Sequence, residues 1–273
     1  MKSLILSLAF FIFLPFVSID LSAQNFQGKA VYYTKSKMEL GSWGARMSEA
    51  QKKQVYARLK NRLEKTYILT FNKHESMFLE KEKIDAVSGA TDSWGGYFSR
   101  GDQYKNIKDN TLVQSQEFYG KRFLVKDKLY KIEWTLGSET KQIGEYTCYR
   151  AKAFVPAKEL SWYNFSWSDL RKPKTEDGKK PEEKMTLVEA WYTPQIPLAH
   201  GPGEFWGLPG MILEVSANNT TMLCSEIMIN SNKTITIEAP SKGKETTKKE
   251  YAQTIKTKMM DMRNNRMGRR RTR

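Results

Sequence analysis

The chain has 273 residues and a formal net charge of +15 at pH 7, with 45 Lys and Arg against 30 Asp and Glu. Much of the excess lies in residues 241–273, where twelve Lys or Arg accompany three Asp or Glu, so the charge describes a basic end rather than a nucleic-acid-binding domain. Only two histidines and two cysteines occur, and their positions match no metal-ligand spacing, so we expect no metal and no cofactor.

Residues 1–23 have the layout of a secretory signal peptide. Lys2 supplies a positive charge, Leu4 to Val17 are nearly all apolar, and Ala23 places a small residue just before a polar one. The apolar run is shorter than the ~20 residues that a membrane helix needs. We therefore predict cleavage after Ala23 and a periplasmic or secreted mature protein, with a retained membrane anchor as the alternative.

Residues 24–240 are expected to form a single β-rich domain that contains one helix. The helix is predicted over 47–65, because Ser48 and Gln51 fit a capping box at its start. Apolar residues recur every four positions within it, at Val55, Leu59 and Leu63. We expect this stripe to cover a sheet.

Short runs of strand composition fill the rest of this domain, and most are joined by connections that suit hairpins. We predict strands at 28–38, 66–71, 76–79, 111–119, 122–127, 129–136, 145–155, 187–193, 211–215, 220–229 and 233–239. The Gly- and Ser-rich residues 86–102 predict a loop. Because strands do not alternate with helices, the pattern predicts a mainly antiparallel, strongly curved sheet or half-open barrel rather than a Rossmann-like fold.

Residues 156–185 are predicted to form an exposed insertion in this domain. Its first part carries an aromatic patch at 162–167, whose rings either pack on the domain or face a ligand. Its second part, 171–184, is charged and nearly devoid of apolar residues.

Residues 241–273 are predicted to form a basic helix with a tail. Tyr251, Ile255 and Met259 are spaced by four, which indicates an amphipathic helix. The terminal run Arg269–Arg273 is rich in arginine and is predicted to attract an anionic membrane surface. We do not expect it to bind nucleic acid, because an exported protein rarely meets any.

The block 200-HGPGEFWGLPGMILEV-215 is rich in Gly and Pro. Its glycines do not fit the spacing of a phosphate-binding loop, and a strand rather than a helix follows. Leu208-Pro209-Gly210 suits a type II turn with Gly210 at positive φ. We therefore predict a stiff structural crossing that leads into a buried strand, with its key residues at Pro202, Gly207, Leu208, Pro209 and Gly210.

The same region supplies the candidates for a ligand site, because a crossing of this kind can also wall a cavity. The candidate lining residues are Trp191, Tyr192, His200, Glu204, Phe205 and Trp206. Glu189, Glu204 and Glu214 are the nearest carboxylates for hydrolysis. Cys148 with His200 is the one nucleophile pair worth stating, and an apolar strand is a poor setting for a reactive thiolate. We therefore predict no catalytic residues.

Cys148 and Cys224 both lie in strand-like runs. An oxidising compartment permits a disulfide between them if their strands are adjacent. Two buried free thiols are the alternative, because cysteine is also a common core residue. The sequence leaves both open.

Three segments of the chain, 134-WTLGSETKQIGEYTCYRAKAF-154, 191-WYTPQIPLAHGP-202 and 207-GLPGMILEV-215, closely resemble the GLPGLI family of exported proteins of Gram-negative bacteria. Met211 stands where the family motif has Leu, and the 156–185 insertion departs from the usual pattern. The resemblance implies no catalytic residues. Some members of that family are associated with TonB-dependent transporters of the outer membrane, so the resemblance implies such a transporter as a candidate partner.

From the signal peptide, the sparse catalytic residues and this resemblance, we expect an exported, non-enzymatic binding or accessory protein. It would be periplasmic or associated with the outer membrane, with a TonB-dependent transporter as partner and an unidentified ligand. The alternative is a periplasmic hydrolase of peptide or glycan that uses the carboxylates near the Gly/Pro block.

Overall fold

The computed structural model describes residues 26–38, 40, 44–81, 100–167, 183–230 and 235–271, with side chains as far as residue 265. The predicted signal peptide and its cleavage site after Ala23 lie outside the described residues, as do the side chains of Arg269–Arg273. Most of the predicted loop at 86–102 also lies outside them.

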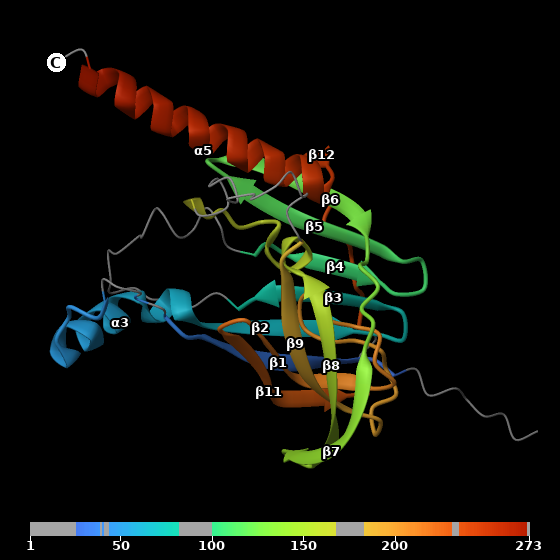
Figure 1. The fold of residues 1–273 in the computed structure, drawn as a ribbon. Coiled ribbons are helices and arrows are strands. Elements are labelled where there is room, and N and C mark those ends of the chain that lie inside the picture. The colour runs from blue at the N-terminus through green and yellow to red at the C-terminus, as the bar shows by residue number, and fades with distance from the viewer. Residues whose placement is uncertain are drawn as a thin grey trace, which may run out of the picture.

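Twelve strands of the described residues form one large sheet (Figure 1). They are β1 (Gly28–Ser36), β2 (Glu64–Phe71), β3 (Glu75–Glu80), β4 (Gln103–Asn106), β5 (Thr111–Phe118), β6 (Lys121–Lys128), β7 (Thr135–Ile143), β8 (Tyr146–Pro156), β9 (Met185–Thr193), β10 (Met211–Ala217), β11 (Thr220–Ile229) and β12 (Lys244–Thr246). Their order in the sheet is β12-β6-β5-β4-β3-β2-β1-β11-β10-β9-β8-β7.

All neighbouring strands in this order are antiparallel except β12, which pairs parallel to β6. The end strands β12 and β7 do not pair with each other, so the sheet is not closed into a barrel. The prediction of a mainly antiparallel, strongly curved and open sheet is therefore confirmed.

The curvature of the sheet creates the main core. In Figure 1, β7, β8 and β9 run steeply across the nearly horizontal strands β1, β2 and β3. One buried apolar cluster joins these two groups of strands. It contains Tyr32, Leu69 and Phe78 from β1, β2 and β3, and Val188 of β9 with Ile212 of the adjacent β10. Alternation along each strand supplies these inward residues, since successive side chains of a strand face opposite sides.

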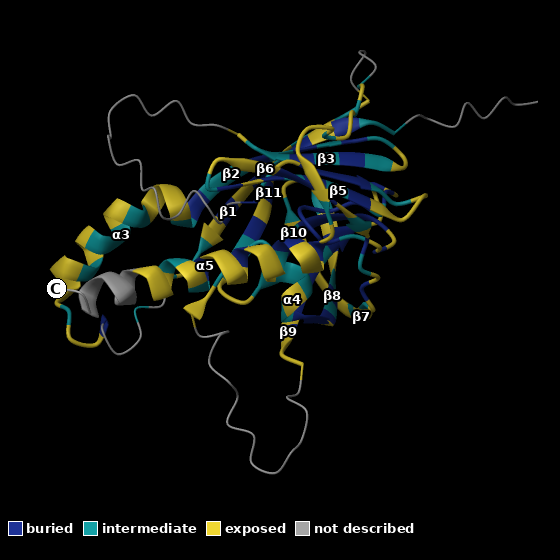
Figure 2. Cartoon of the chain, turned by 90° about the horizontal axis from the view of Figure 1, so that it is seen from above, coloured by how far each residue is buried: buried dark blue, intermediate teal, exposed yellow. Residues whose placement is uncertain are grey.

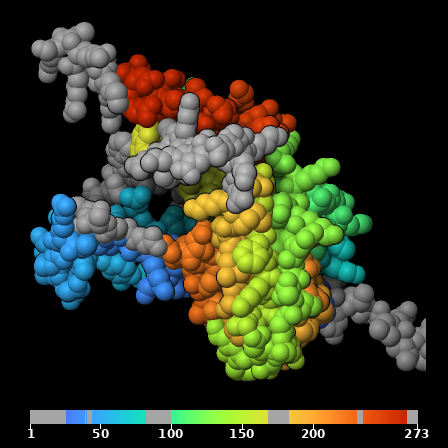
Figure 3. All heavy atoms as spheres, viewed as in Figure 1, coloured from blue at the N-terminus to red at the C-terminus, as the bar shows by residue number. Residues whose placement is uncertain are grey.

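Three α-helices occur in the described residues: α3 (Glu49–Leu63), α4 (Ala157–Ser161) and α5 (Lys248–Arg271). The predicted capping box of α3 is confirmed, because the Ser48 side chain accepts from Gln51 N and the Gln51 side chain accepts from Ser48 N. The predicted coverage of the sheet is only partial: no residue of α3 is buried, and the helix projects from the body of the molecule (Figures 1 and 3).

The predicted C-terminal amphipathic helix is confirmed as α5, which packs across one end of the sheet (Figures 1 and 2). Tyr251, Ile255 and Met259 are buried in a second apolar cluster with Phe123 of β6 and Trp162. Trp162 opens the predicted aromatic patch, so this part of the patch packs on the domain. None of the helices in the described part of the chain is long and apolar enough to span a membrane.

Two predicted strands are wrong, and two short strands of the described residues, β4 and β12, were not predicted. Residues 129–134 form no strand, because Tyr130 and Trp134 instead make hydrogen bonds to Trp206, described below; the strand begins at Thr135 and continues through a polar, exposed stretch. The described part of 233–239 also forms no strand. Strand β4 was missed because its four residues, QYKN, are too short and too polar to predict one.

Candidate functional site

Residues 194–210, which we call the crossing segment, connect β9 to β10. Backbone hydrogen bonds fix its fold: Gly207 N donates to Ala199 O (3.0 Å), and Ile212 N donates to His200 O (3.0 Å). Four of its apolar side chains are buried in the main core: Ile196, Leu198, Phe205 and Leu208. The predicted structural crossing is therefore present, and it is an internal part of the fold.

Positive φ was predicted at Gly210, but it occurs at other glycines of the crossing segment. Positive φ occurs at Gly203 (55°) and Gly207 (91°), and Gly210 does not have it. Gly210 is required for close approach instead, because a Cβ there would lie 2.2 Å from the Thr193 carbonyl oxygen. The predicted type II turn with Gly210 at positive φ is therefore wrong.

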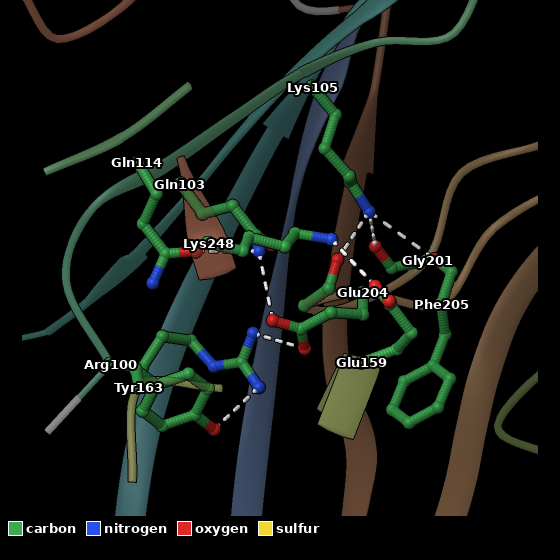
Figure 4. Close-up of polar contacts among 11 residues, drawn as sticks. Arg100, Gln103, Lys105, Gln114, Glu159, Tyr163, Gly201, Glu204, Phe205 and Lys248 are labelled. Atoms are coloured by element: carbon green, nitrogen blue, oxygen red, sulfur yellow. Dashed lines mark hydrogen bonds and ion pairs between the residues drawn. The ribbon is translucent and has the colours of Figure 1, made fainter. Parts of the chain in front are cut away.

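Lys105 of β4 ties the crossing segment to the sheet (Figure 4). Its ammonium group is fully buried and donates three hydrogen bonds, to the carbonyl oxygens of Gly201 (2.7 Å), Gly203 (2.7 Å) and Phe205 (3.3 Å). Burial lowers the pKa of Lys105 to about 7, although Glu204 nearby opposes this shift. Three acceptors match the three protons of an ammonium group, so the lysine acts as an internal clamp on the segment.

Glu204 forms a buried ion pair with Arg100, the residue that precedes β4 by three positions. Arg100 Nη1 lies 2.5 Å from Glu204 Oε2, and Gln103 Nε2 donates to Glu204 Oε1 at 3.1 Å. Burial disfavours the charge of Arg100, but Glu204 and Tyr163 beside it raise its pKa above the ordinary value. Tyr163 also accepts a hydrogen bond from Arg100 Nη2 at 3.0 Å. Both oxygens of Glu204 are therefore occupied.

His200, within the crossing segment, is fully buried. Its Nε2 lies 2.9 Å from the Asn72 carbonyl oxygen, which is an acceptor, so Nε2 carries the proton and Nδ1 does not. Nδ1 has no hydrogen-bond partner in the described residues. Burial, with a smaller effect from Lys105, lowers the pKa of His200 to about 3. The ring is thus a neutral core group at neutral pH.

The aromatic candidates do not meet around one cavity. Phe205 and Tyr192 are buried in the main core. Trp206 donates to Tyr130 O (2.9 Å) and accepts at its own carbonyl from Trp134 Nε1 (2.8 Å). Trp191 faces the other side of β9 from Tyr192, with Lys141 Nζ 5.2 Å from its ring centre.

Among the six candidates, Glu204 borders a small hollow in the described part of the chain. The hollow measures about 10 Å³, which is room for roughly one water molecule. The hydrolase candidates Glu189 and Glu214 lie elsewhere: Glu189 is near Arg150 and Lys152 on β8, and Glu214 pairs with Lys141 at 2.5 Å.

Cys148 and Cys224 are free and buried. Burial raises the pKa of Cys148 to about 11 and that of Cys224 to about 12. Such thiols are mostly protonated at neutral pH and are weak nucleophiles. The described residues contain no group of three or more His, Cys, Asp or Glu side chains that could hold a metal ion.

An open groove of about 910 Å³ lies outside the crossing segment, between the start of α5, the connection from β6 to β7, and α4. We call it the lysine groove. It is lined by Asp127, Lys128, Leu129, Tyr130, Lys131, Lys158, Glu159, Trp162, Lys248, Lys249, Ala252, Gln253 and Lys256.

The floor of the lysine groove is an ion pair between Lys248 and Glu159, whose Nζ and Oε2 are 3.1 Å apart (Figure 4). The same two residues line the small hollow beside Glu204. Sequence reasoning missed this groove, because its lysines come from three separate segments. The basic excess of residues 241–273 was the one available signal, and it was assigned to the tail.

Comparison with known proteins gives one family match, over part of the chain. The model of a family described as a protein of unknown function (Porph_ging) matches residues 134–214, which run from just before β7 through the crossing segment into β10. No curated protein matches the chain significantly.

Two solved structures, both of PNGF-II, show a distant likeness. One has a TM-score of 0.47 and 14% identity over 84% of this chain and 32% of its own length. The other has a TM-score of 0.41 and 13% identity over 76% of this chain and 29% of its own length. The chain therefore spans about a third of the solved protein that it matches. The family match covers β8, β9 and the crossing segment without assigning them an activity.

Proposed function

We propose that the protein is an exported, non-catalytic binding or accessory protein of the cell envelope, periplasmic or associated with the outer membrane. The observation that carries this proposal is a contrast between two sets of charged side chains, one buried and hydrogen-bonded within the protein and the other lining an open groove. Glu204 of the crossing segment, and Lys105 of β4 that binds this segment, make their hydrogen bonds to groups inside the protein. An open, lysine-lined groove lies apart from them.

The buried groups of the crossing segment are poorly suited to catalysis. A general acid or base must reach the proton it transfers, and the hollow beside Glu204 holds roughly one water. His200 is buried against a backbone carbonyl, and no described observation favours the hydrolase alternative. Binding therefore accounts better for the arrangement.

Export and the choice of partner rest on the sequence. Residues 1–23 have the layout of a signal peptide, and the motif at 207–215 resembles the GLPGLI family, some members of which associate with TonB-dependent transporters. We propose such a transporter as the partner. An anionic membrane surface at Arg269–Arg273 stays a separate prediction.

The test is recovery of the full chain from its native envelope with a C-terminal tag. We expect the tagged protein in the periplasmic or outer-membrane fraction, with an N-terminus at Gln24, and a TonB-dependent transporter retained with it after mild detergent extraction. A second exported protein with the same tag is the control. Uncleaved protein in the cytoplasm would overturn export, and repeated recovery without a transporter would overturn the partner.

A further inference from the structure

The lysine groove carries more positive charge than its own residues neutralise. Its lining contains six lysines and two carboxylates, and both carboxylates have partners. Glu159 pairs with Lys248, and Asp127 Oδ2 accepts from the backbone N–H of Lys248 at 3.1 Å. The lining lysines therefore exceed the two lining carboxylates by four positive charges.

Four of the lining lysines have no ion pair in the described part of the chain. They are Lys128, Lys131, Lys249 and Lys256, and all four are exposed. Like charges gathered around one hollow repel each other and concentrate anions from solution. The groove therefore favours an anionic occupant.

The positions of the lysines favour an occupant with several charges. Lys249 and Lys256 lie two helical turns apart on α5, which is about 10 Å along the helix axis. Lys128 at the end of β6 and Lys131 just after it belong to a separate part of the lining. One phosphate is too small to reach both ends of this set, whereas a chain of two or three phosphates spans much of it.

The residue types suit phosphate. The groove lining contains six lysines, and lysine binds phosphate as a point charge. The volume of about 910 Å³ falls in the range of small-molecule sites, roughly 300–1,000 Å³.

Trp162 gives a second, independent indication of a ligand. It lines the groove, it is 4% exposed, and its indole N–H has no hydrogen-bond partner in the described residues. A buried donor without an acceptor costs about 1–3 kcal/mol. An anionic oxygen within hydrogen-bonding distance of this N–H would supply that acceptor.

From these observations we infer that the lysine groove binds a ligand with two or more adjacent phosphate groups, either free or as the headgroup of a lipid. The inference names the ligand of the binding protein proposed above and rests on that function. The groove is open at the surface while the Glu159–Lys248 pair forms its floor, so the ligand enters without disturbing the crossing segment.

The experiment is calorimetric titration of the purified mature chain with inorganic tripolyphosphate, and with orthophosphate for comparison, at low salt. We expect tripolyphosphate to bind at least tenfold more tightly. The double variant Lys249→Gln/Lys256→Gln should weaken tripolyphosphate binding by about tenfold or more, because it removes two charged contacts with the ligand. Trp162→Phe should weaken it by a smaller factor.

The matched control is Lys244→Gln/Lys258→Gln, which removes the same charge from exposed lysines that do not line the groove. We expect its binding to change less than twofold. Either of two outcomes overturns the inference: absent tripolyphosphate binding by the wild type, or equal losses in the two double variants, which would show binding by net charge alone. Envelope recovery of the chain is measured separately, so its failure and failure of the groove are distinguishable.

Vesicles separate the two sources of phosphate. Phosphatidylcholine vesicles that contain a pyrophosphate-headgroup lipid are compared with vesicles that carry the same charge as phosphatidylglycerol. Binding to the first set alone, lost in Lys249→Gln/Lys256→Gln, identifies a lipid headgroup. Tripolyphosphate binding without any vesicle binding identifies a free ligand. Vesicle binding that is the same in the wild type and in Lys249→Gln/Lys256→Gln contradicts a lipid in this site.

Discussion

The crossing segment and the lysine groove contain the same kinds of charged groups in opposite states. Against the crossing segment, Arg100 is buried with Glu204, and Lys105 of β4 donates to three of the segment's carbonyl oxygens. In the groove, Lys249 and Lys256 are exposed and have no ion pair among the described residues. Charges that are paired in the interior maintain a fold, whereas charges left open on a surface are available to a partner.

The strongest test of this comparison is Glu204→Gln. The substitution leaves the Arg100 guanidinium buried without a counter-ion, and breaking a buried pair in this way costs about 3–5 kcal/mol. Urea unfolding at pH 7 measures it. Glu189→Gln, on a half-buried carboxylate 3.8 Å from Lys152, is the control and should cost less than about 1 kcal/mol. Equal losses would show that Glu204 is no more structural than a surface carboxylate.

The next test is the dependence of stability on pH through His200. Its folded pKa of about 3 lies below the ordinary value, so the folded protein resists protonation of this ring. Its contribution to stability is complete above pH 6.5 and is lost as pH falls towards 3, by about 3 kcal/mol at pH 4.

Unfolding by urea at pH 7 and pH 4 separates this contribution from that of the carboxylates. His200→Gln should lose less stability than the wild type over this interval, by about the same 3 kcal/mol. His74→Gln changes the other histidine, which is exposed, and should follow the wild type. An unchanged pH dependence in His200→Gln would mean that the buried ring does not titrate as described.

The smallest effect is expected in the lysine groove. Lys249→Gln and Lys256→Gln should each change the free energy of unfolding by less than about 0.5 kcal/mol, because exposed side chains without specific contacts contribute little. The double variant could gain a little stability from reduced repulsion. Thermal and urea unfolding measure the single and double variants. A loss of more than about 1 kcal/mol in the free energy of unfolding would show that these lysines stabilise the fold.

Local signals explain most of what the sequence predicted correctly. The capping box at Ser48 and Gln51, the apolar spacing of Tyr251 and Ile255, and the alternation along most strands depend on neighbours a few residues away. Each of these features is confirmed. The proline-rich crossing before Met211 was recognised for the same reason, since proline restricts the backbone wherever it stands.

Long-range partners explain what was missed. The sequence drew attention to Glu204 and His200, but their partners Arg100 and Asn72 lie more than one hundred residues away. Lys105 belongs to a four-residue polar strand that shows no periodicity. The lysine groove is built from three segments, and no one of them carries a pattern that predicts a site.

The sheet order has a consequence for how the chain acquires its fold. Strand β1 lies between β2 and β11, with Gly28 opposite Ile229, and the hydroxyl of Tyr32 donates to the carbonyl of Ile212. The middle of the sheet is thus completed only after nearly the whole chain has left the ribosome. Pairings between distant segments slow folding, so the seam between β1 and β11 should form late.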